Sequence, residues 1–281
     1  MKILRTTALV VGFSLVASIH LISNAATVAA GFDTQTLSNN DDDSTGPVSL
    51  GFNFNYYGTI YSQAFVNNNG NVTFGGALAD YTPTGLNGAT KLPIIAPFFA
   101  DVDTRESSPV TFGMGNYAGR NAFGVTYANV GYYDFHADKT NTFQLVLVDR
   151  SDVQSGDADI YFNYDSILFE TGDEDGGVDG LGGIAARAGY SNGSGIAGTF
   201  FELTGSGVPG SFINGGPFAL NMSLNNSTPG QYLFNVRAGV VTAPGVIPAP
   251  PTVGEVPEPG IVVLLGAGLL GLITARRRKF F

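Results

Sequence analysis

The chain has 281 residues, of which 44% are hydrophobic, 13% are charged, 39 are glycine and none is cysteine or tryptophan. A chain without cysteine has no disulfide scaffold, thiolate nucleophile, iron–sulfur cluster or zinc finger, and two histidines are too few for a histidine-rich metal site. The net charge of −10 is the sum of +2 on residues 1–30, −15 on residues 31–255 and +3 on residues 256–281, so the acidic centre favours cations or neutral ligands such as sugars over nucleic acid and anionic lipid.

The first 30 residues have the organisation of a secretory signal peptide. Two basic residues open the chain, residues 8–22 are largely apolar, and small residues that suit cleavage follow, with Ala25 or Ala30 as the last residue removed. The apolar run is short for a retained membrane anchor. We predict a signal helix over residues 1–30, export by the Sec machinery, and an acidic mobile segment over residues 31–45 that contains Asp41, Asp42 and Asp43.

Residues 46–241 have the alternating pattern of β-strands. Apolar and polar or small side chains alternate from Val48 to Tyr56, Gly58 interrupts the pattern, and the Asn-Gly step at residues 69–70 is typical of a hairpin turn. Further strands are predicted at residues 64–67, 72–74, 94–96, 110–114, 122–127, 142–148, 160–164, 184–190, 199–203 and 233–237. These short strands and their Gly, Asn and Asp turns predict an all-β fold, a single antiparallel β-sandwich.

The segment LPIIAPFFADVDTR at residues 92–105 resembles the signature of the nidogen-like extracellular (NIDO) domain. Further pieces match in order at residues 52–58, 68–74, 125–133, 141–147, 162–167 and 188–191, so the resemblance covers about residues 46–204. It implies a role in extracellular matrix or in cell–matrix adhesion. The structural motif at its centre comprises Pro97, Phe99, Asp101, Asp103 and Arg105.

Two carboxylates in this motif have two interpretations. Asp101 and Asp103 share one face with Arg105 if the chain is extended. The guanidinium of Arg105 could hold a carboxylate in a structural ion pair through its planar fork. Alternatively, the carboxylates could belong to a site for a hard cation such as calcium, which takes about six to eight oxygen ligands from several loops.

A second acidic stretch lies at residues 170–180, where five acids are mixed with four glycines. The spacing of Asp173, Asp175 and Asp179 faintly resembles a calcium-binding loop, but the terminal bidentate glutamate of an EF-hand is missing. Either a solvated acidic loop or a calcium site fits this composition.

One segment matches the sequence pattern of a hydrolase nucleophile but lacks the features that such a site needs. Residues 189–193, GYSNG, match the G-x-S-x-G pattern of a nucleophile elbow, which needs a strand-to-helix turn and a histidine later in the chain. The last histidine, His136, precedes the serine, and the segment that follows is rich in glycine. We therefore predict a strand end and turn here, and no catalytic residue.

The C-terminal part is predicted to be a linker followed by a sorting signal. Residues 242–255 contain four prolines and predict an extended Pro-rich linker. A Pro-Glu-Pro tripeptide, an apolar run at residues 261–275 and a basic cluster follow in this order, which closely resembles the bacterial PEP-CTERM signal recognised by exosortase. The resemblance implies a short transmembrane helix within residues 256–281, transient inner-membrane anchoring and removal of the tail. The sorting motif comprises Pro257, Glu258, Pro259, Arg276, Arg277 and Arg278.

Together these features predict an exported, non-enzymatic bacterial protein of the cell surface or extracellular matrix, acting in cell–matrix adhesion or in biofilm or exopolysaccharide assembly. The alternative is a calcium-assisted carbohydrate-binding module of the extracellular matrix. Exosortase, the Sec machinery and matrix or polysaccharide are the expected partners, and nucleic acid is not among them. Calcium is the one cofactor that the acidic residues suggest.

Overall fold

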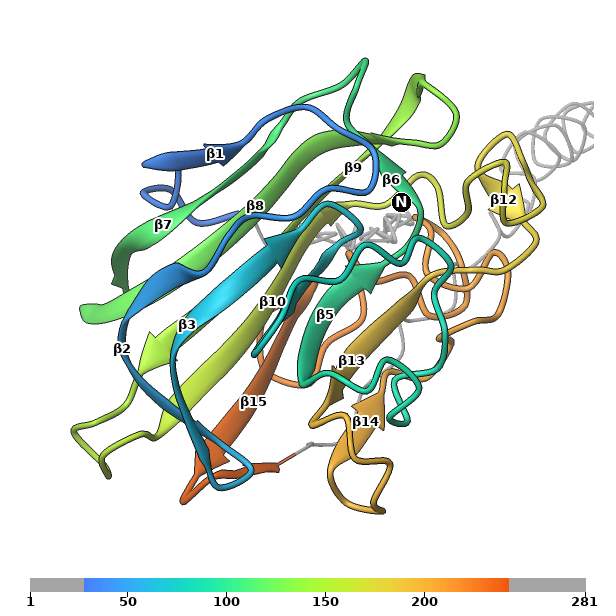
Figure 1. The fold of residues 1–281 in the computed structure, drawn as a ribbon. Helices are drawn as coiled ribbons and strands as arrows, with labels where there is room; N and C mark the ends of the chain where they lie inside the picture. The colour runs from blue at the N-terminus through green and yellow to red at the C-terminus, as the bar shows by residue number, and fades with distance from the viewer. Residues whose placement is uncertain (1–27, 243–281) are drawn as a thin grey trace, which may run out of the picture.

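The computed structural model describes residues 28–242, and within this range it contains strands and turns but no α-helix. Two antiparallel sheets lie against each other and enclose one main hydrophobic core (Figure 1). The prediction of an all-β, antiparallel fold is thereby confirmed. Residues 28–242 hold no helix with the length and apolarity to cross a bilayer. The predicted sorting helix, the predicted linker apart from Thr242, which ends the last strand, and all but the last three residues of the predicted signal helix lie outside the described residues.

The larger sheet contains the longest strands of the described chain. Ile160, Phe162 and Tyr164 alternate toward the core, because successive side chains of a strand point to opposite faces. The strand order is β1 (Gln35–Leu37), β7 (Val110–Tyr117), β8 (Arg120–Tyr132), β9 (His136–Asp149), β10 (Ala158–Ser166), β15 (Gln231–Arg237) and β16 (Val240–Thr242), and the short β6 (Val102–Asp103) pairs with β8.

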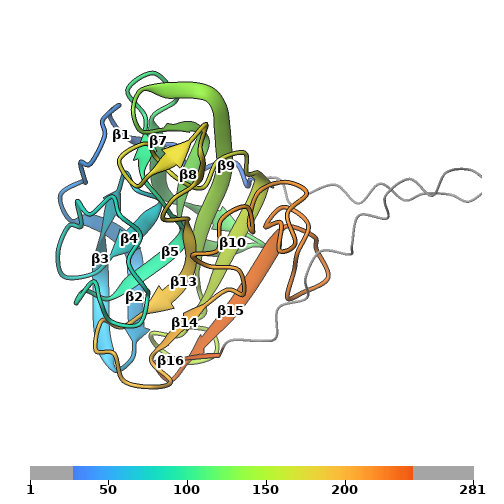
Figure 2. The same ribbon diagram turned by 90° about the vertical axis from the view of Figure 1, so that its right-hand side faces the viewer.

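The smaller sheet is built around a fully buried strand, β5 (Ile94–Phe99). Its strand order is β14 (Phe200–Glu202), β13 (Arg187–Ser191), β5, β4 (Asn71–Thr73), β3 (Thr59–Asn67) and β2 (Val48–Tyr56). A separate small hairpin joins β11 (Gly177–Val178) to β12 (Leu181–Gly182). Figure 2 shows the smaller sheet lying over β8, β9 and β10 of the larger one.

Aromatic side chains from both sheets meet in the core. The ring of Phe98 in β5 lies 5.2 Å from that of Phe143 in β9, which stacks on Tyr127 in β8 at 4.6 Å. The hydroxyl of Tyr127 donates a 2.7 Å hydrogen bond to the carbonyl of Asn67, and that of Tyr164 donates a 2.6 Å bond to the carbonyl of Pro97. A buried hydroxyl needs a hydrogen-bond partner. These two bonds therefore fix the position of one sheet relative to the other, in addition to holding the sheets in contact.

Gly70, in the turn between β3 and β4, lies directly against β5. Its φ is +72°, and a Cβ at this position would overlap the carbonyl oxygen of Phe98. The backbone nitrogen of Phe98 in turn donates a 3.2 Å hydrogen bond to the carbonyl of Gly70. Only glycine combines this conformation with this close approach. The turn therefore sets the position of the end of β5.

The structure differs from the prediction in the bounds of several strands and in the packing of the N-terminal segment. The strand predicted at residues 184–190 begins only at Arg187, while those predicted at 94–96, 122–127 and 142–148 are longer than the local pattern indicated. Residues 31–45 were predicted to be mobile, but the structure packs them on the domain: β1 pairs with β7, and the backbone of Asn40 hydrogen-bonds to Thr104. Contacts between residues that are far apart in the sequence account for these differences.

We predict that Gly70→Ala destabilises the protein by about 3 kcal/mol or more, because it adds both a steric overlap and a strained backbone. Gly58→Ala is the matched control: Gly58 also has a positive φ, +86°, but a Cβ there would have no neighbour within 4 Å. The control should cost about 1–2 kcal/mol. Urea unfolding of both variants measures the difference, and equal losses would contradict the packing role of Gly70.

Candidate metal centre

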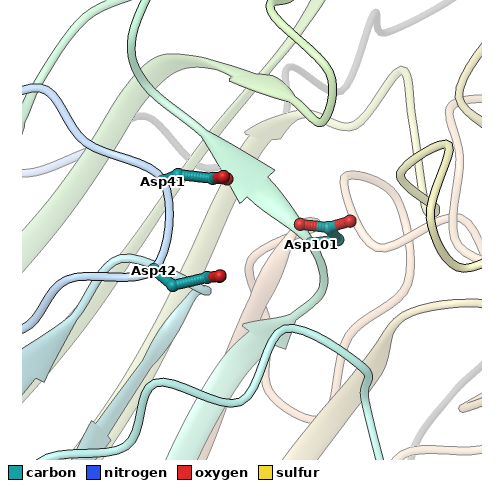
Figure 3. Close-up of side chains that lie close together, drawn as sticks. All are labelled: Asp41, Asp42 and Asp101. Carbon is teal, nitrogen blue, oxygen red and sulfur yellow. The ribbon is translucent and has the colours of Figure 1, made fainter.

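An acidic pocket lies where the chain leaves β5. Its volume is about 310 Å³, and three segments far apart in sequence bring carboxylates to it: the stretch before β2, with Asp41 and Asp42, the corner between β5 and β6, with Asp101, and the 170–180 loop, with Glu174. Figure 3 shows Asp41 and Asp42 directed from the N-terminal segment toward Asp101. The residues that line the pocket are Asp41, Asp42, Tyr81, Asp101, Tyr133 and Glu174.

Two buried asparagines hold the N-terminal segment beside this corner. The side-chain amide of Asn68 donates to the backbone carbonyls of both Asp41 and Val102. The amide of Asn69 donates a 2.8 Å bond to Asp42 Oδ1, while its oxygen accepts a 2.9 Å bond from the backbone nitrogen of Val102. An amide side chain carries two N–H donors and an acceptor oxygen, so each asparagine can bind two segments of the chain at once.

The carboxylates in and beside the pocket are short of hydrogen-bond donors. Asp101 is 2% exposed and its Oδ2 has no partner. Asp175, 7% exposed, accepts a 2.7 Å bond from the hydroxyl of Thr82 through Oδ1, but its Oδ2 is buried without a partner. Asp41 Oδ1 is a third such atom. Buried carboxylate oxygens without donors are unfavourable unless a cation or a proton compensates them.

The electrostatics of the pocket follow from this arrangement. Burial, and then the nearby carboxylates of Asp175, Asp41 and Asp42, raise the pKa of Asp101 from 3.8 to about 8. Burial also raises the pKa of Asp41 to about 6, and raises those of Asp42 and Asp175. All four shifts have the same sign because like charges are gathered where water is partly excluded.

Asp103 and Arg105 lie next to the pocket but are engaged with each other. The guanidinium of Arg105 bonds to Asp103 at 2.9 Å through Nε and at 2.5 Å through Nη2. It also lies over the ring of Phe135, 3.5 Å from its centre. Asp103 further accepts from the backbone nitrogens of Arg105 and Phe135, so hydrogen bonds lower its pKa despite burial. Asp103 therefore occupies the geometry of a structural ion pair, while Asp101, two residues earlier, faces the pocket.

The other acidic residues singled out from the sequence separate in space. Asp173 Oδ2 lies 3.1 Å from His136 Nε2, and exposed Asp179 has its carbonyl bonded to Lys139. Of the three aspartates in the 170–180 loop, only Asp175 exerts a sizeable charge effect on Asp101. The run of three aspartates at residues 41–43 is a similar but weaker candidate in the sequence, and its approach to Asp101 was not predicted.

Comparison with known proteins identifies the domain and its sorting signal. The family model for the nidogen-like domain matches residues 62–238, and a PEP-CTERM protein-sorting motif matches residues 255–279. The chain belongs to the nidogen-like domain family. Both predicted resemblances are thereby confirmed. A nidogen-like domain joined to this motif supports an exported, extracellular or surface protein that exosortase processes.

The relatives of the nidogen-like domain are much longer proteins. Alpha-tectorin of Gallus gallus is 31% identical over 220 residues, which cover 70% of this chain and 10% of the relative. Nidogen of Drosophila melanogaster is 30% identical over 209 residues, which cover 64% of this chain and 14% of the relative. This chain thus spans about a tenth of the alpha-tectorin and a seventh of the nidogen it matches. No solved structure matches this chain.

The serine of the G-x-S-x-G sequence is part of the nidogen-like sheet. Ser191 ends β13, is fully buried, and its hydroxyl oxygen accepts a 3.0 Å bond from the backbone nitrogen of Gly193. His136 pairs with Asp173 on another part of the domain. The segment is therefore a strand end and turn, whereas the acidic pocket offers the oxygen ligands that a hard cation such as calcium prefers.

We predict that the nidogen-like domain without bound cation loses stability as the pH rises. The folded-state pKa of Asp101, about 8, lies above its ordinary value of 3.8, so the folded protein binds this proton more tightly than the unfolded chain does. This stabilisation is complete below about pH 4 and is lost as the pH rises toward 8.

Urea unfolding with a chelator, at several pH values, measures this effect. Asp41, Asp42 and Asp175 titrate in the same direction, so the difference between the wild type and Asp101→Asn isolates the contribution of Asp101. The wild type should lose stability relative to the variant as the pH rises. A difference that does not change with pH would contradict the prediction.

Proposed function

We propose that this chain is a non-enzymatic module displayed at the bacterial surface or in the extracellular matrix, where it acts in cell–matrix adhesion or in biofilm or exopolysaccharide assembly. The observation that carries the proposal is the joining, in one chain, of a nidogen-like domain at residues 62–238 and a sorting motif at residues 255–279. The first provides a folded extracellular module, and the second provides its route to the surface.

The composition of the domain fits this role. Residues 31–255 carry a charge of −15. Because the chain has no cysteine, its core and its sheet hydrogen bonds stabilise the domain in an oxidising environment without disulfides. The serine of the hydrolase-like sequence is buried, as described above, and supplies no exposed nucleophile. In this proposal the signal peptide leads the chain to the Sec machinery, the tail anchors it transiently in the inner membrane, and exosortase removes the tail near Pro257-Glu258-Pro259.

The proposal predicts that a strain lacking the protein attaches to surfaces and forms biofilm several-fold less well than the wild type. Full-length protein supplied in trans should restore attachment. A chain in which Pro257, Glu258 and Pro259 are all alanine should be exported but not processed, and should restore attachment poorly, because sorting depends on this tripeptide. Crystal-violet staining and fractionation by immunoblot measure both effects. Normal attachment without the protein would refute the adhesion role, and unchanged processing of the alanine variant would refute the sorting step.

A second candidate function is calcium-assisted binding of extracellular carbohydrate. It is favoured by one observation: the half-buried rings of Tyr81 and Tyr133 line the same pocket as the carboxylates of Asp41 and Asp101. Aromatic faces beside a few convergent polar groups are common in small-molecule sites.

A glycan array read with calcium and with a chelator tests this second function. It should show a defined, calcium-dependent sugar preference that Tyr81→Ala or Tyr133→Ala reduces at least tenfold. Tyr117→Ala is the control, because Tyr117 ends β7 and pairs with Arg120 at the start of β8, whereas Tyr133 follows the other end of β8. Absence of any sugar preference, together with a loss of attachment in the deletion strain, would favour the adhesion module alone.

A further inference from the structure

The acidic pocket points to a specific ligand. We propose that it binds one calcium ion through the carboxylates of Asp41, Asp42 and Asp101, and that this ion fastens the N-terminal segment 38–44 to the corner between β5 and β6. Asp175 does not line the pocket but adds negative charge near Asp101. This inference goes beyond the proposed function and does not depend on it, because it concerns what stabilises the fold.

The positions of the three carboxylates allow one ion to contact all of them. Each residue offers a carboxylate oxygen, and these atoms all lie within 4.8 Å of one another. Two oxygens bound to the same calcium at about 2.4 Å are separated by at most about 4.8 Å. The separations among Asp41, Asp42 and Asp101 are therefore within the range that ligands of one calcium ion span.

Independent support comes from the buried, unpartnered oxygen of Asp101. The residue is 2% exposed, lines the pocket, and has no hydrogen bond at Oδ2. Gly172 packs so closely that a Cβ at this position would overlap that oxygen, so loop 170–176 lies against one side of the carboxylate. A cation bound to this carboxylate would compensate the group, for which the described protein atoms provide no partner at Oδ2.

The local positive charge does not balance the cluster. Arg105 is the nearby cation, and its Nη2 lies 3.4 Å from Asp41 Oδ2. Its short contacts, however, are to Asp103 at 2.5 Å and to Asp134 at 3.0 Å. One guanidinium shared among three carboxylates leaves Asp42, Asp101 and Asp175 without a counter-charge in direct contact. A divalent cation would neutralise this excess.

The donor set favours calcium over other metals. The pocket lining contains carboxylate and phenol oxygens but no histidine, and the chain has no cysteine, so the nitrogen and sulfur ligands that select zinc or copper are absent. Magnesium usually binds through one or two carboxylates and keeps several waters, whereas calcium accepts more carboxylates in a flexible arrangement. A volume of about 310 Å³ also leaves room for the waters that complete a calcium shell.

The structural consequence follows from the positions of the ligands. Asp41 and Asp42 precede the domain's first long strand, and Asp101 follows its most buried one, about 60 residues later. The hydrogen bonds of Asn68 and Asn69 already bring these segments together. An ion bound only in the folded state adds its binding free energy to folding. Calcium should therefore stabilise the domain and order its N-terminal segment.

The test is thermal unfolding of the full-length chain in detergent, with millimolar calcium, with magnesium at the same ionic strength, and with a chelator. We expect calcium to raise the melting temperature by at least about 5 °C over the chelator, and magnesium to give less than half of this shift. Equal shifts with the two metals, or no shift with calcium, would overturn the proposal.

Three variants locate the site. Asp101→Asn should abolish the calcium shift and, in chelator, should melt at or above the wild-type temperature, because it replaces a buried carboxyl group that has no partner at Oδ2 with a neutral amide. Asp42→Asn should weaken the shift and provides a second, less buried probe should the first variant misfold. Asp43→Asn is the matched control: it removes the same charge from an exposed neighbour and should keep the full shift. Retention of the shift in both Asp101→Asn and Asp42→Asn, or its loss in Asp43→Asn, would place the ion elsewhere.

Discussion

The turn at Asn68-Asn69-Gly70 determines where four parts of the chain meet. Gly70 packs against the backbone of Phe98 without a side chain between them, so β4 and the end of β5 are fixed together. Asn68 and Asn69, each 1% exposed, use their amides on both the N-terminal segment and the corner that follows β5. Buried amide groups must be satisfied, so these contacts are costly to break. The rest of the acidic pocket depends on them.

The buried strand β5 explains why the pocket is electrostatically unfavourable when it holds no cation. All six of its residues are buried, and the chain turns immediately afterwards, so Asp101 enters a position from which water is largely excluded. Two residues later, Asp103 meets the fork of Arg105 and is stabilised as a carboxylate. The same short segment thus contains one compensated and one uncompensated charge. Proteins depart from good local electrostatics mainly where a site requires it, and a cation site is such a requirement.

The fold was largely predictable because its long strands carry their own signal. Alternation identified β2, and apolar runs identified the cores of β5, β8, β9 and β10, since their side chains are buried on a pleated surface. The ends of these strands were not predictable, because pairing continues through residues such as those at 128–132 and 136–141 that lack a clear pattern. The two- and three-residue strands β1, β6 and β16 depend entirely on their neighbours.

The site was predictable only in part, for a related physical reason. The spacing of Asp101, Asp103 and Arg105 is local, and it suggested both an ion pair and a cation site. In the structure Asp103 forms the ion pair with Arg105, while Asp101 Oδ2 has no hydrogen-bond partner. The approach of Asp41 and Asp42 is set by side-chain amides from another hairpin, which no local pattern reveals. Likewise, the 170–180 loop places Asp173 beside His136, Glu174 in the lining of the pocket and Asp175 where its charge affects Asp101, a division that its sequence spacing does not contain.

The most direct test of this account is a crystal structure of the protein grown with calcium, with the ion located by its anomalous scattering. The account predicts one calcium peak bonded to carboxylate oxygens of Asp41, Asp42 and Asp101 at about 2.3–2.6 Å, with the Asn68 and Asn69 contacts intact. A pocket that contains only water, or a calcium ion bound instead by Asp173 and Asp179 in the 170–180 loop, would contradict it.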